Sequence, residues 1–154
     1  MKEYSLPPGI EVFERGWLSA NNILHFGEDD VSLVDTGYVA HQSMTLGLVR
    51  NALDKHDLST MNKVVNTHLH SDHCGGNAAL KEAYDCQIYI PASEADAVQN
   101  WNEDLLSYQN LGQDCPRFSF DHVLMPDQRI RLGRYEWDIL AAPGHDPHSV
   151  MLYQ

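Results

Sequence analysis

The sequence predicts a mixed α/β domain, and two patterns along the chain carry that prediction. Strand-like runs, several of them joined by short turns, alternate with segments whose apolar residues recur every three or four positions. The chain has 154 residues, of which 43% are hydrophobic and 21% charged, so it can bury a core of its own. We therefore expect one α/β domain over residues 1–154.

The first expected strands lie before the first helix. They cover residues 10–15, 21–27 and 30–35. The acidic pair at 28–29 follows Gly27 and indicates a hairpin turn between the second and third strands. Val31 and Val34 place apolar side chains on opposite faces of the third strand, so we expect that strand to be buried on both sides.

The remaining elements follow the same two patterns. They are a helix over 39–56, a strand over 62–66, a helix over 77–84, a strand over 87–90 closed by Pro91, a helix over 94–101 with Ser93 as its N-cap, a strand pair at 129–132 and 137–141, and a final strand from Val150. Residues 101–121 have no clear period, and their aromatic side chains are interpreted as core rather than as a lid.

Charge and composition limit the classes of ligand and the cellular location that we expect for the protein. Acidic residues outnumber lysine and arginine by 22 to 10, and the net charge of −12 disfavours a nucleic-acid ligand. We find neither an apolar run of signal-peptide length near the start nor a membrane-spanning run of about 18 residues. The three cysteines have no pairing pattern, which favours a cytoplasmic location, and Cys74 is interpreted as a small buried side chain rather than a redox group.

The densest group of functional residue types lies within residues 67–76, which read THLHSDHCGG. His68, His70, Asp72 and His73 fall within six positions there. Imidazole and carboxylate groups are costly to bury without partners, and both are ligands that zinc accepts. A histidine-rich surface turn and a purely structural zinc site are the alternatives, but structural sites favour cysteine ligands.

Spacing divides this group into two sets. Side chains alternate along an extended segment, so His68 and His70 should project to the same side and bind one metal. Asp72 and His73 lie where the strand gives way to the Gly75-Gly76 turn, and we expect them to face a second metal. Two metals bridged by a hydroxide would provide a nucleophile at neutral pH.

The run from His68 to His73 resembles the signature of the metallo-β-lactamase superfamily. Asp35-Thr36-Gly37, Gly75-Gly76-Asn77 and Pro143-Gly144-His145 resemble further elements of that family, in matching order. The resemblance implies an αββα sandwich of which this chain covers the first half to two-thirds. It also implies that a bridging aspartate and a final histidine lie beyond residue 154, so the domain is expected to be incomplete at its C-terminal end.

The resemblance also assigns roles to individual residues. His68, His70 and His145 would bind the first metal, and Asp72 and His73 would belong to the second, with Asp72 also given the catalytic role. Asp35 would orient a ligand, although a turn carboxylate is the simpler alternative. His148 could contact substrate or donate a proton, whereas a turn-bonded surface histidine is the simpler alternative. The expected cofactor is zinc, two ions in a complete protein, with one iron ion as the alternative.

Three functions remain open on the sequence alone. The leading one is a hydrolase whose metal-bound hydroxide attacks the carbonyl of a small-molecule thioester, ester or lactone. The second is a non-haem iron oxidoreductase resembling persulfide dioxygenases. The third is an inactive metal-binding fragment whose uncovered sheet edge would favour a homo-oligomer.

Overall fold

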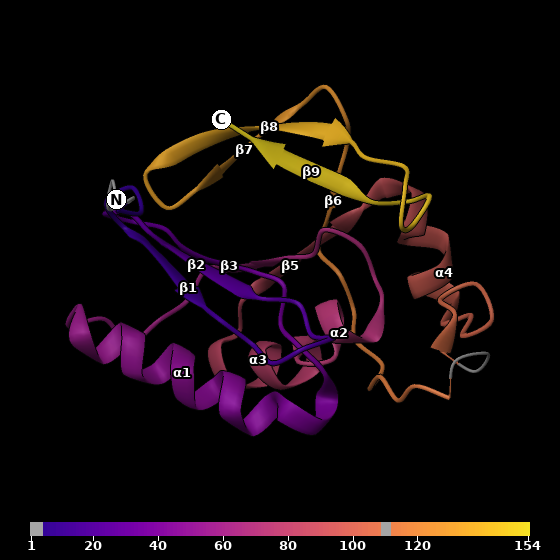
Figure 1. The fold of residues 1–154 in the computed structure, drawn as a ribbon, viewed down its shortest axis with the longest axis horizontal. Coiled ribbons are helices and arrows are strands. Elements are labelled where there is room, and N and C mark those ends of the chain that lie inside the picture. The colour runs from indigo at the N-terminus through magenta and orange to yellow at the C-terminus, as the bar shows by residue number, and fades with distance from the viewer. Residues whose placement is uncertain (1–4, 109–111) are drawn as a thin grey trace.

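The computed structural model describes residues 5–108 and 112–154 and contains two sheets that pack face to face (Figure 1). The larger sheet has six strands in the spatial order of the sequence: β1 (Ile10–Phe13), β2 (Asn22–Phe26), β3 (Val31–Val34), β4 (Lys63–Val65), β5 (Gln87–Pro91) and β6 (His122–Leu124). Its first three strands are antiparallel, and β3 to β6 run parallel. The parallel part brings the ends of β3 and β4 to one edge of the sheet.

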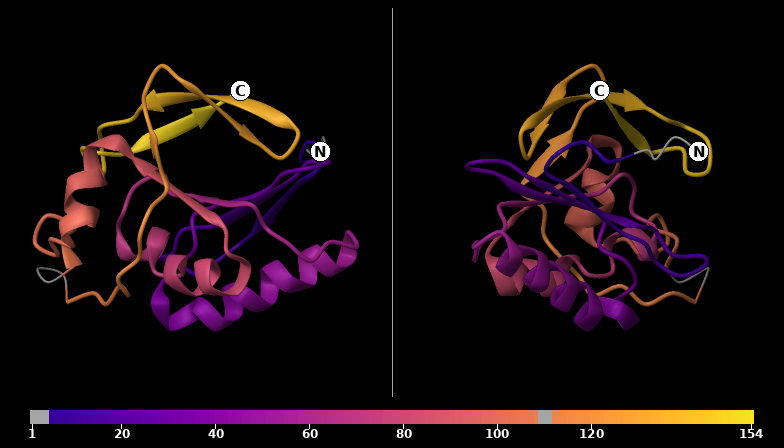
Figure 2. Two further views of the ribbon diagram at one scale, coloured as in Figure 1. Left: turned by 180° about the vertical axis from the view of Figure 1, so that it is seen from behind. Right: turned by 60° about the vertical axis from the view of Figure 1, so that its left-hand side comes forward.

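The smaller sheet follows in the sequence and is antiparallel throughout. Its strands are β7 (Arg129–Leu132), β8 (Tyr135–Ala141) and β9 (Val150–Tyr153), in that order across the sheet. Figure 2 shows this sheet lying over one face of the larger sheet in two further views. The connection between β8 and β9 therefore ends near the loops of the larger sheet.

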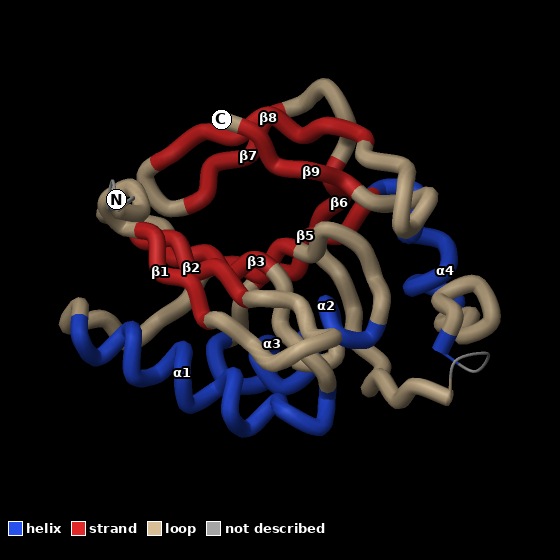
Figure 3. Tube along the Cα trace, in the orientation of Figure 1, coloured by secondary structure: helices blue, strands red, loops and turns tan. Residues whose placement is uncertain are grey.

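Helices cover the opposite face of the larger sheet. Figure 3 shows α1 (Gln42–Lys55) and α3 (Asn77–Tyr84) beneath β1 to β5. The shorter elements are η1 (Val39–His41), α2 (Ser71–Cys74), η2 (Ala92–Glu94) and α4 (Ala95–Asn100). In residues 5–108 and 112–154, no helix covers the outer face of the smaller sheet, so the described layers are helix, sheet and sheet.

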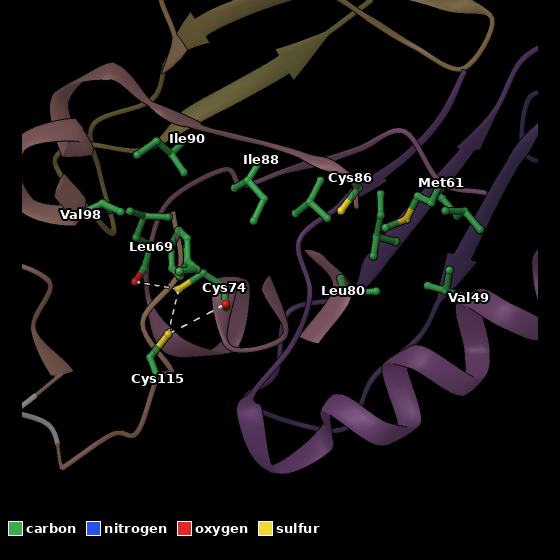
Figure 4. Packing of buried hydrophobic residues seen from close by; sticks show 14 of the residues in the cluster. Val49, Met61, Leu69, Cys74, Leu80, Cys86, Ile88, Ile90, Val98 and Cys115 are labelled. Carbon is green, nitrogen blue, oxygen red and sulfur yellow. Dashed lines mark hydrogen bonds between the residues drawn. The ribbon is translucent and has the colours of Figure 1, made fainter. Parts of the chain in front are cut away.

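Two apolar clusters hold these layers together. The larger lies between the helices and the six-stranded sheet and includes Val49, Leu80, Ile88 and Ile90, which Figure 4 draws as sticks. The smaller lies between the sheets and consists of seven buried side chains: Val34, Val65, Leu124, Ile130, Leu132, Ile139 and Val150. The strand β3 contributes to both clusters and is buried along its whole length, which confirms the prediction for residues 30–35.

The two sheets also meet through backbone at the turn of the β2–β3 hairpin and the turn of the β7–β8 hairpin. A Cβ atom on Gly27 would lie 2.6 Å from the carbonyl carbon of Gly133, and Gly133 itself has a φ of +57°. The Gly133 amide donates a hydrogen bond of 2.7 Å to Asp30 Oδ2. Glycine is required at this contact because any side chain would separate the two turns.

Most predicted elements are present, and four details of the prediction were wrong. Pro91 belongs to β5 instead of closing it, and the expected long helix begins as a 3₁₀ turn at Val39. Ser93 lies in a second 3₁₀ turn and is not the N-cap of α4, whose N-cap residue is Glu94. The strand β6 was not predicted.

No helix in the part of the chain that the structure describes is long and apolar enough to cross a membrane.

Candidate metal centre

The predicted ligands converge at the edge of the larger sheet, below the connection between β8 and β9. His68 and His70 follow β4, Asp72 and His73 lie in α2, and His145 belongs to the β8–β9 connection. His68, His70 and His145 each offer one ring nitrogen, and these nitrogens all lie within 4.8 Å of one another. Residues that are 75 positions apart, His70 and His145, thus form one cluster.

Asp35 fixes the segment that carries this cluster. It follows β3 with a φ of +58°, and its Oδ1 accepts a hydrogen bond of 3.0 Å from the Thr67 amide. Its Oδ2 accepts 2.9 Å from the Thr67 hydroxyl and lies 2.8 Å from His73 Nδ1. One buried carboxylate therefore contacts both the start of the cluster and the ring of His73. The role of Asp35 as a residue that orients a metal ligand stays a prediction.

Close backbone packing fixes α2 as well. A Cβ atom on Gly75 would lie 2.4 Å from the Val39 amide nitrogen, and one on Gly76 would lie 2.7 Å from the Thr36 carbonyl oxygen. The Thr36 amide in turn donates 2.8 Å to the carbonyl oxygen of His73. The two glycines of the sequence motif are needed because the turn after α2 presses directly on the segment that follows β3.

Asp146 is a member of the site that the sequence interpretation missed. Its Oδ2 lies 3.3 Å from His70 Nε2, and its Oδ1 accepts a hydrogen bond of 2.7 Å from the amide of His148. The carboxylate thus ties His70 of the larger sheet to the β8–β9 connection. The sequence does contain a signal for Asp146, which is its position directly after the predicted ligand His145. A metal-bound histidine commonly donates its other N–H to a carboxylate, so a carboxylate near the predicted ligands is a candidate partner.

Each of the His68 and His70 rings has one nitrogen that faces the cluster and one that faces away from it. The contacts of the nitrogens that face away determine whether the nitrogens that face the cluster are free to bind a metal. His70 Nε2 faces Asp146, and His68 Nδ1 lies 3.2 Å from the Thr67 hydroxyl, so the tautomers that satisfy these contacts place the protons there. The inner atoms, His68 Nε2 and His70 Nδ1, then carry lone pairs and face each other at 3.2 Å. His145 Nε2 lies 3.0 Å from the same His70 nitrogen. Converging lone pairs of neutral imidazoles fit a divalent metal such as zinc.

Burial keeps two of these rings neutral. It lowers the pKa of His68 to about 4, with the neighbouring His73 acting in the same direction, and it also lowers the pKa of His70. Burial alone would lower the pKa of His73, but the hydrogen bond and charge of Asp35 and the charge of Asp72 raise it overall. A metal therefore meets unprotonated imidazoles at His68 and His70 near neutral pH.

Asp72 and His73 lie next to the three-histidine cluster and outside it. Asp72 Oδ2 lies 3.5 Å from His73 Nε2 and accepts 3.0 Å from the Ala20 amide. The rings of His68 and His73 are 3.8 Å apart between centroids, so the two sets adjoin. Their assignment to a second metal stays a prediction.

A cavity of about 540 Å³ opens beside both sets. Its lining consists of Leu18, Ser19, Ala20, Tyr38, His70, Asp72, His73, Gln113 and His145. His148 is not among these residues: its side chain is exposed and lines a separate cavity of about 250 Å³. The structure therefore brings His145 to the cluster and leaves His148 outside the cavity, so a substrate role for His148 finds no support in the geometry.

Comparison with known proteins relates this site to a family. The family model of the metallo-beta-lactamase superfamily matches residues 15–154. YqgX of Bacillus subtilis (strain 168), a probable metallo-hydrolase, is 26% identical over 141 residues, which cover 90% of this chain and 62% of that protein. A hydroxyacylglutathione hydrolase of Hyphomonas neptunium is 51% identical over 39 residues, which cover 25% of this chain and 15% of that enzyme.

Solved structures give the same relation at the level of the fold. A Cronobacter sakazakii metallo-beta-lactamase superposes with a TM-score of 0.76 at 19% identity, and the match covers 96% of this chain and 55% of that structure. The matched region covers 62% of YqgX and 55% of the Cronobacter structure, so the chain spans about half to two-thirds of the length of these two proteins. Because the family model matches almost the whole chain, the protein belongs to the metallo-β-lactamase superfamily.

Proposed function

We propose that this chain carries the metal-binding part of a hydrolase that cleaves a thioester, or a related ester or lactone, in a small molecule. The observation that carries the proposal is the convergence of the His68, His70 and His145 nitrogens within 4.8 Å. A cavity of about 540 Å³ beside them has room for a small molecule. The partial match to a hydroxyacylglutathione hydrolase favours a thioester as the first substrate to test.

The residues present fit zinc. When bound, the metal would supply Lewis-acid polarisation of the substrate carbonyl and would lower the pKa of a water molecule. Asp146 would hold His70 in the tautomer whose Nδ1 points inward, and the Thr67 hydroxyl would do the same for His68 Nε2. Asp35 would hold the His73 ring by its Nδ1 and leave Nε2 directed toward Asp72.

Asp72 is the candidate for the residue that handles protons in the reaction. It lines the cavity, its Oδ2 is held by the Ala20 amide, and it lies beside His73. A carboxylate held in this way can orient a water molecule or accept its proton. Binding of a second zinc ion by Asp72 and His73 would use the same atoms, so zinc stoichiometry decides between the two roles.

Two polar side chains, Tyr38 and Gln113, line the cavity together with the cluster. Tyr38 donates a hydrogen bond of 2.9 Å to the Leu18 carbonyl. Gln113 accepts a hydrogen bond from the Ser71 hydroxyl. Polar groups therefore surround the cluster at its rim, where they can hydrogen-bond the polar parts of a thioester substrate.

The test is a substrate panel with matched variants. The chain, refolded with zinc, should hydrolyse a thioester faster than a lactone, and a phosphodiester least. His68→Ala and His70→Ala should each lower the rate by at least about 100-fold, because the remaining ligands cannot hold the metal. His122→Ala removes an exposed histidine on β6 and should leave the rate unchanged. Rates that persist in both cluster variants would refute a metal-dependent reaction.

Metal analysis separates this proposal from its two competitors. Zinc at one or two equivalents, retained by the wild type and lost by His70→Ala, is the expected result. One equivalent of iron in protein made without added metal would instead favour the oxidoreductase. Zinc binding without turnover of any substrate would favour the inactive fragment. Because β9 lies at the edge of its sheet, self-association through this strand remains a prediction. Light scattering would test it.

A further inference from the structure

A pair of buried thiols adjoins the predicted ligands, because Cys74 directly follows His73 in the sequence. Cys74 Sγ and Cys115 Sγ are 3.7 Å apart, and Figure 4 shows the two side chains pointing toward each other. Cys74 is 1% exposed and Cys115 is 6% exposed, and both are free thiols. The two residues are 41 positions apart in the sequence, so folding alone brings them together.

The surroundings of the pair are polar as well as apolar. The Tyr108 hydroxyl lies 3.1 Å from Cys74 Sγ and donates 2.9 Å to the Leu69 carbonyl. Cys74 Sγ itself lies 3.4 Å from the carbonyl oxygens of Leu69 and His70. These contacts favour the orientation in which the Cys74 sulfur faces Cys115. An apolar side chain of the same size could not make these contacts.

We propose that Cys74 and Cys115 are a redox-sensitive pair that a hydroperoxide converts into an intrachain disulfide. The sulfur atoms must approach from 3.7 Å to about 2.05 Å when the bond forms. The proposal depends on the geometry of the two thiols and does not depend on the reaction proposed for the metal centre.

The oxidation proceeds in two balanced steps. The Cys115 thiolate attacks the hydroperoxide, its S–O bond forms as the O–O bond breaks, and with hydrogen peroxide the products are a sulfenic acid and hydroxide. Cys74 then attacks the Cys115 sulfur, the S–S bond forms, the S–O bond breaks, and water leaves. In sum, two thiols and one peroxide give one disulfide and two waters, so the peroxide receives the two electrons.

Cys115 is the better first nucleophile of the two. It is the more exposed, and the hydrogen bond from the Cys74 thiol lowers its pKa although burial acts in the opposite direction. Cys74 then serves as the resolving thiol, because it is already within contact distance.

The disulfide would join two segments that flank the cavity. Cys74 is the last residue of α2, the helix that carries Asp72 and His73. Cys115 is two positions beyond Gln113, which accepts a hydrogen bond from Ser71 at the start of α2. A covalent link between these segments would hold Gln113 at the cavity rim and limit opening of the chain around Cys115.

The experiment treats the reduced chain of 154 residues with hydrogen peroxide and maps its thiols and linked peptides. The expected product has one free thiol, Cys86, and one peptide pair joining Cys74 to Cys115, and dithiothreitol restores three thiols. The exposed Arg117 gives an independent readout, since trypsin should cleave after it several-fold more slowly in the oxidised protein.

Two variants make the outcome specific. Cys115→Ser should leave Cys74 outside any intrachain disulfide, while Cys86→Ser, at an equally buried thiol outside the pair, should still form the link. Three free thiols after treatment, a link through Cys86, or only intermolecular disulfides would each overturn the proposal. Mapping of the wild type alone gives this answer if either variant fails to fold.

Discussion

The two sheets differ in how they are covered and in what they bring to the metal centre. The six-stranded sheet is covered by α1 and α3 on one face and by the smaller sheet on the other, and its loops carry His68, His70, Asp72 and His73. The smaller sheet has one covered face in the described residues and contributes His145 alone among the predicted ligands. Four of the predicted ligands thus depend on local structure, and the fifth depends on how the smaller sheet packs on the larger one.

This difference makes the contact between the sheets a determinant of the site. His145 can reach His70 only if β8 and β9 lie at the correct height and angle over the larger sheet. Two features fix that placement: the apolar cluster between the sheets and the meeting of the two hairpin turns at Gly27 and Gly133. Changes at these features should affect His145 first, while the ligands that follow β4 keep their arrangement.

The largest effect is expected from Gly27→Ala. Its Cβ atom would lie 2.6 Å from the carbonyl carbon of Gly133, and the three nearest atoms all belong to the backbone, so the turns must separate. We expect a loss of about 3 kcal/mol or more in the free energy of unfolding, together with weaker zinc binding. Urea denaturation measures the first quantity and zinc titration the second.

Gly47→Ala, in helix α1, is the matched control for a glycine-to-alanine change that causes no close contact. A Cβ atom there meets no atom within 4 Å, and Gly47 lies inside α1, so alanine should stabilise the protein by up to about 1 kcal/mol. Equal losses in the two variants would show that the close approach of the turns is not what holds the sheets in place.

The next effect is expected from Asp30→Ala. Asp30 accepts hydrogen bonds from the Ser32 hydroxyl and the Gly133 amide and pairs with Lys63 at 3.0 Å, all within the buried junction of the sheets. Removal of one partner from a buried ion pair leaves the other charge uncompensated, so we expect a loss of about 3 kcal/mol by urea denaturation.

Its neighbour Asp29 provides the control. The carboxylate of Asp29 pairs with Arg131 at the surface, where the side chain of Asp29 is 72% exposed. Asp29→Ala should therefore change the free energy of unfolding by less than about 1 kcal/mol. A loss as large as that of Asp30→Ala would contradict the assignment of the buried carboxylate as the link between sheets.

Asp146→Asn tests the link between the sheets at the predicted metal site. The amide keeps the shape of the carboxylate but lacks the charge that faces His70 Nε2 at 3.3 Å. We expect zinc affinity to fall by about 10- to 100-fold with little change in stability, as measured by competition with a chelator. Asp138→Asn on β8 removes the exposed pair with Arg129 and should leave zinc affinity unchanged.

The local half of the site could be predicted because its ligands are close together in the sequence. His68, His70, Asp72 and His73 occupy six positions, and their spacing alone indicated a metal site. The family motif added His145 through its Pro143-Gly144 turn. Asp146 was missed because its role depends on the approach of a loop from the other sheet, which no periodicity in its own segment records.

The fold shows the same division between local and distant information. The mixed α/β class and the elements with clear periods, such as α1 and β7, were predicted from their own residues. The strand β6 was missed because it has three residues, of which only Leu124 is buried, and it forms by parallel pairing with β5. The thiol pair was missed for the same reason: Cys74 and Cys115 are neighbours only in space.

The smallest effect is expected from His25, which lies between the sheets. Its ring packs edge-on against Trp137 of β8 at 5.4 Å, and its Nδ1 has no hydrogen-bond partner among the described residues. Burial lowers the pKa of His25 to about 4, although the charge of Asp30 acts in the opposite direction. In the unfolded chain the pKa is about 6.5, so as the pH falls the unfolded state takes up the proton first.

Stability from His25 is therefore complete above about pH 6.5 and is lost progressively as the pH falls toward 4. The loss between pH 7 and pH 5.5 should be about 1 kcal/mol. Burial lowers the pKa of His68 and of His70 as well, so the informative quantity is the difference between the wild type and His25→Leu. The variant should lose less stability over this interval, and an identical pH profile would mean that the contact between the sheets holds a protonated His25 at no cost.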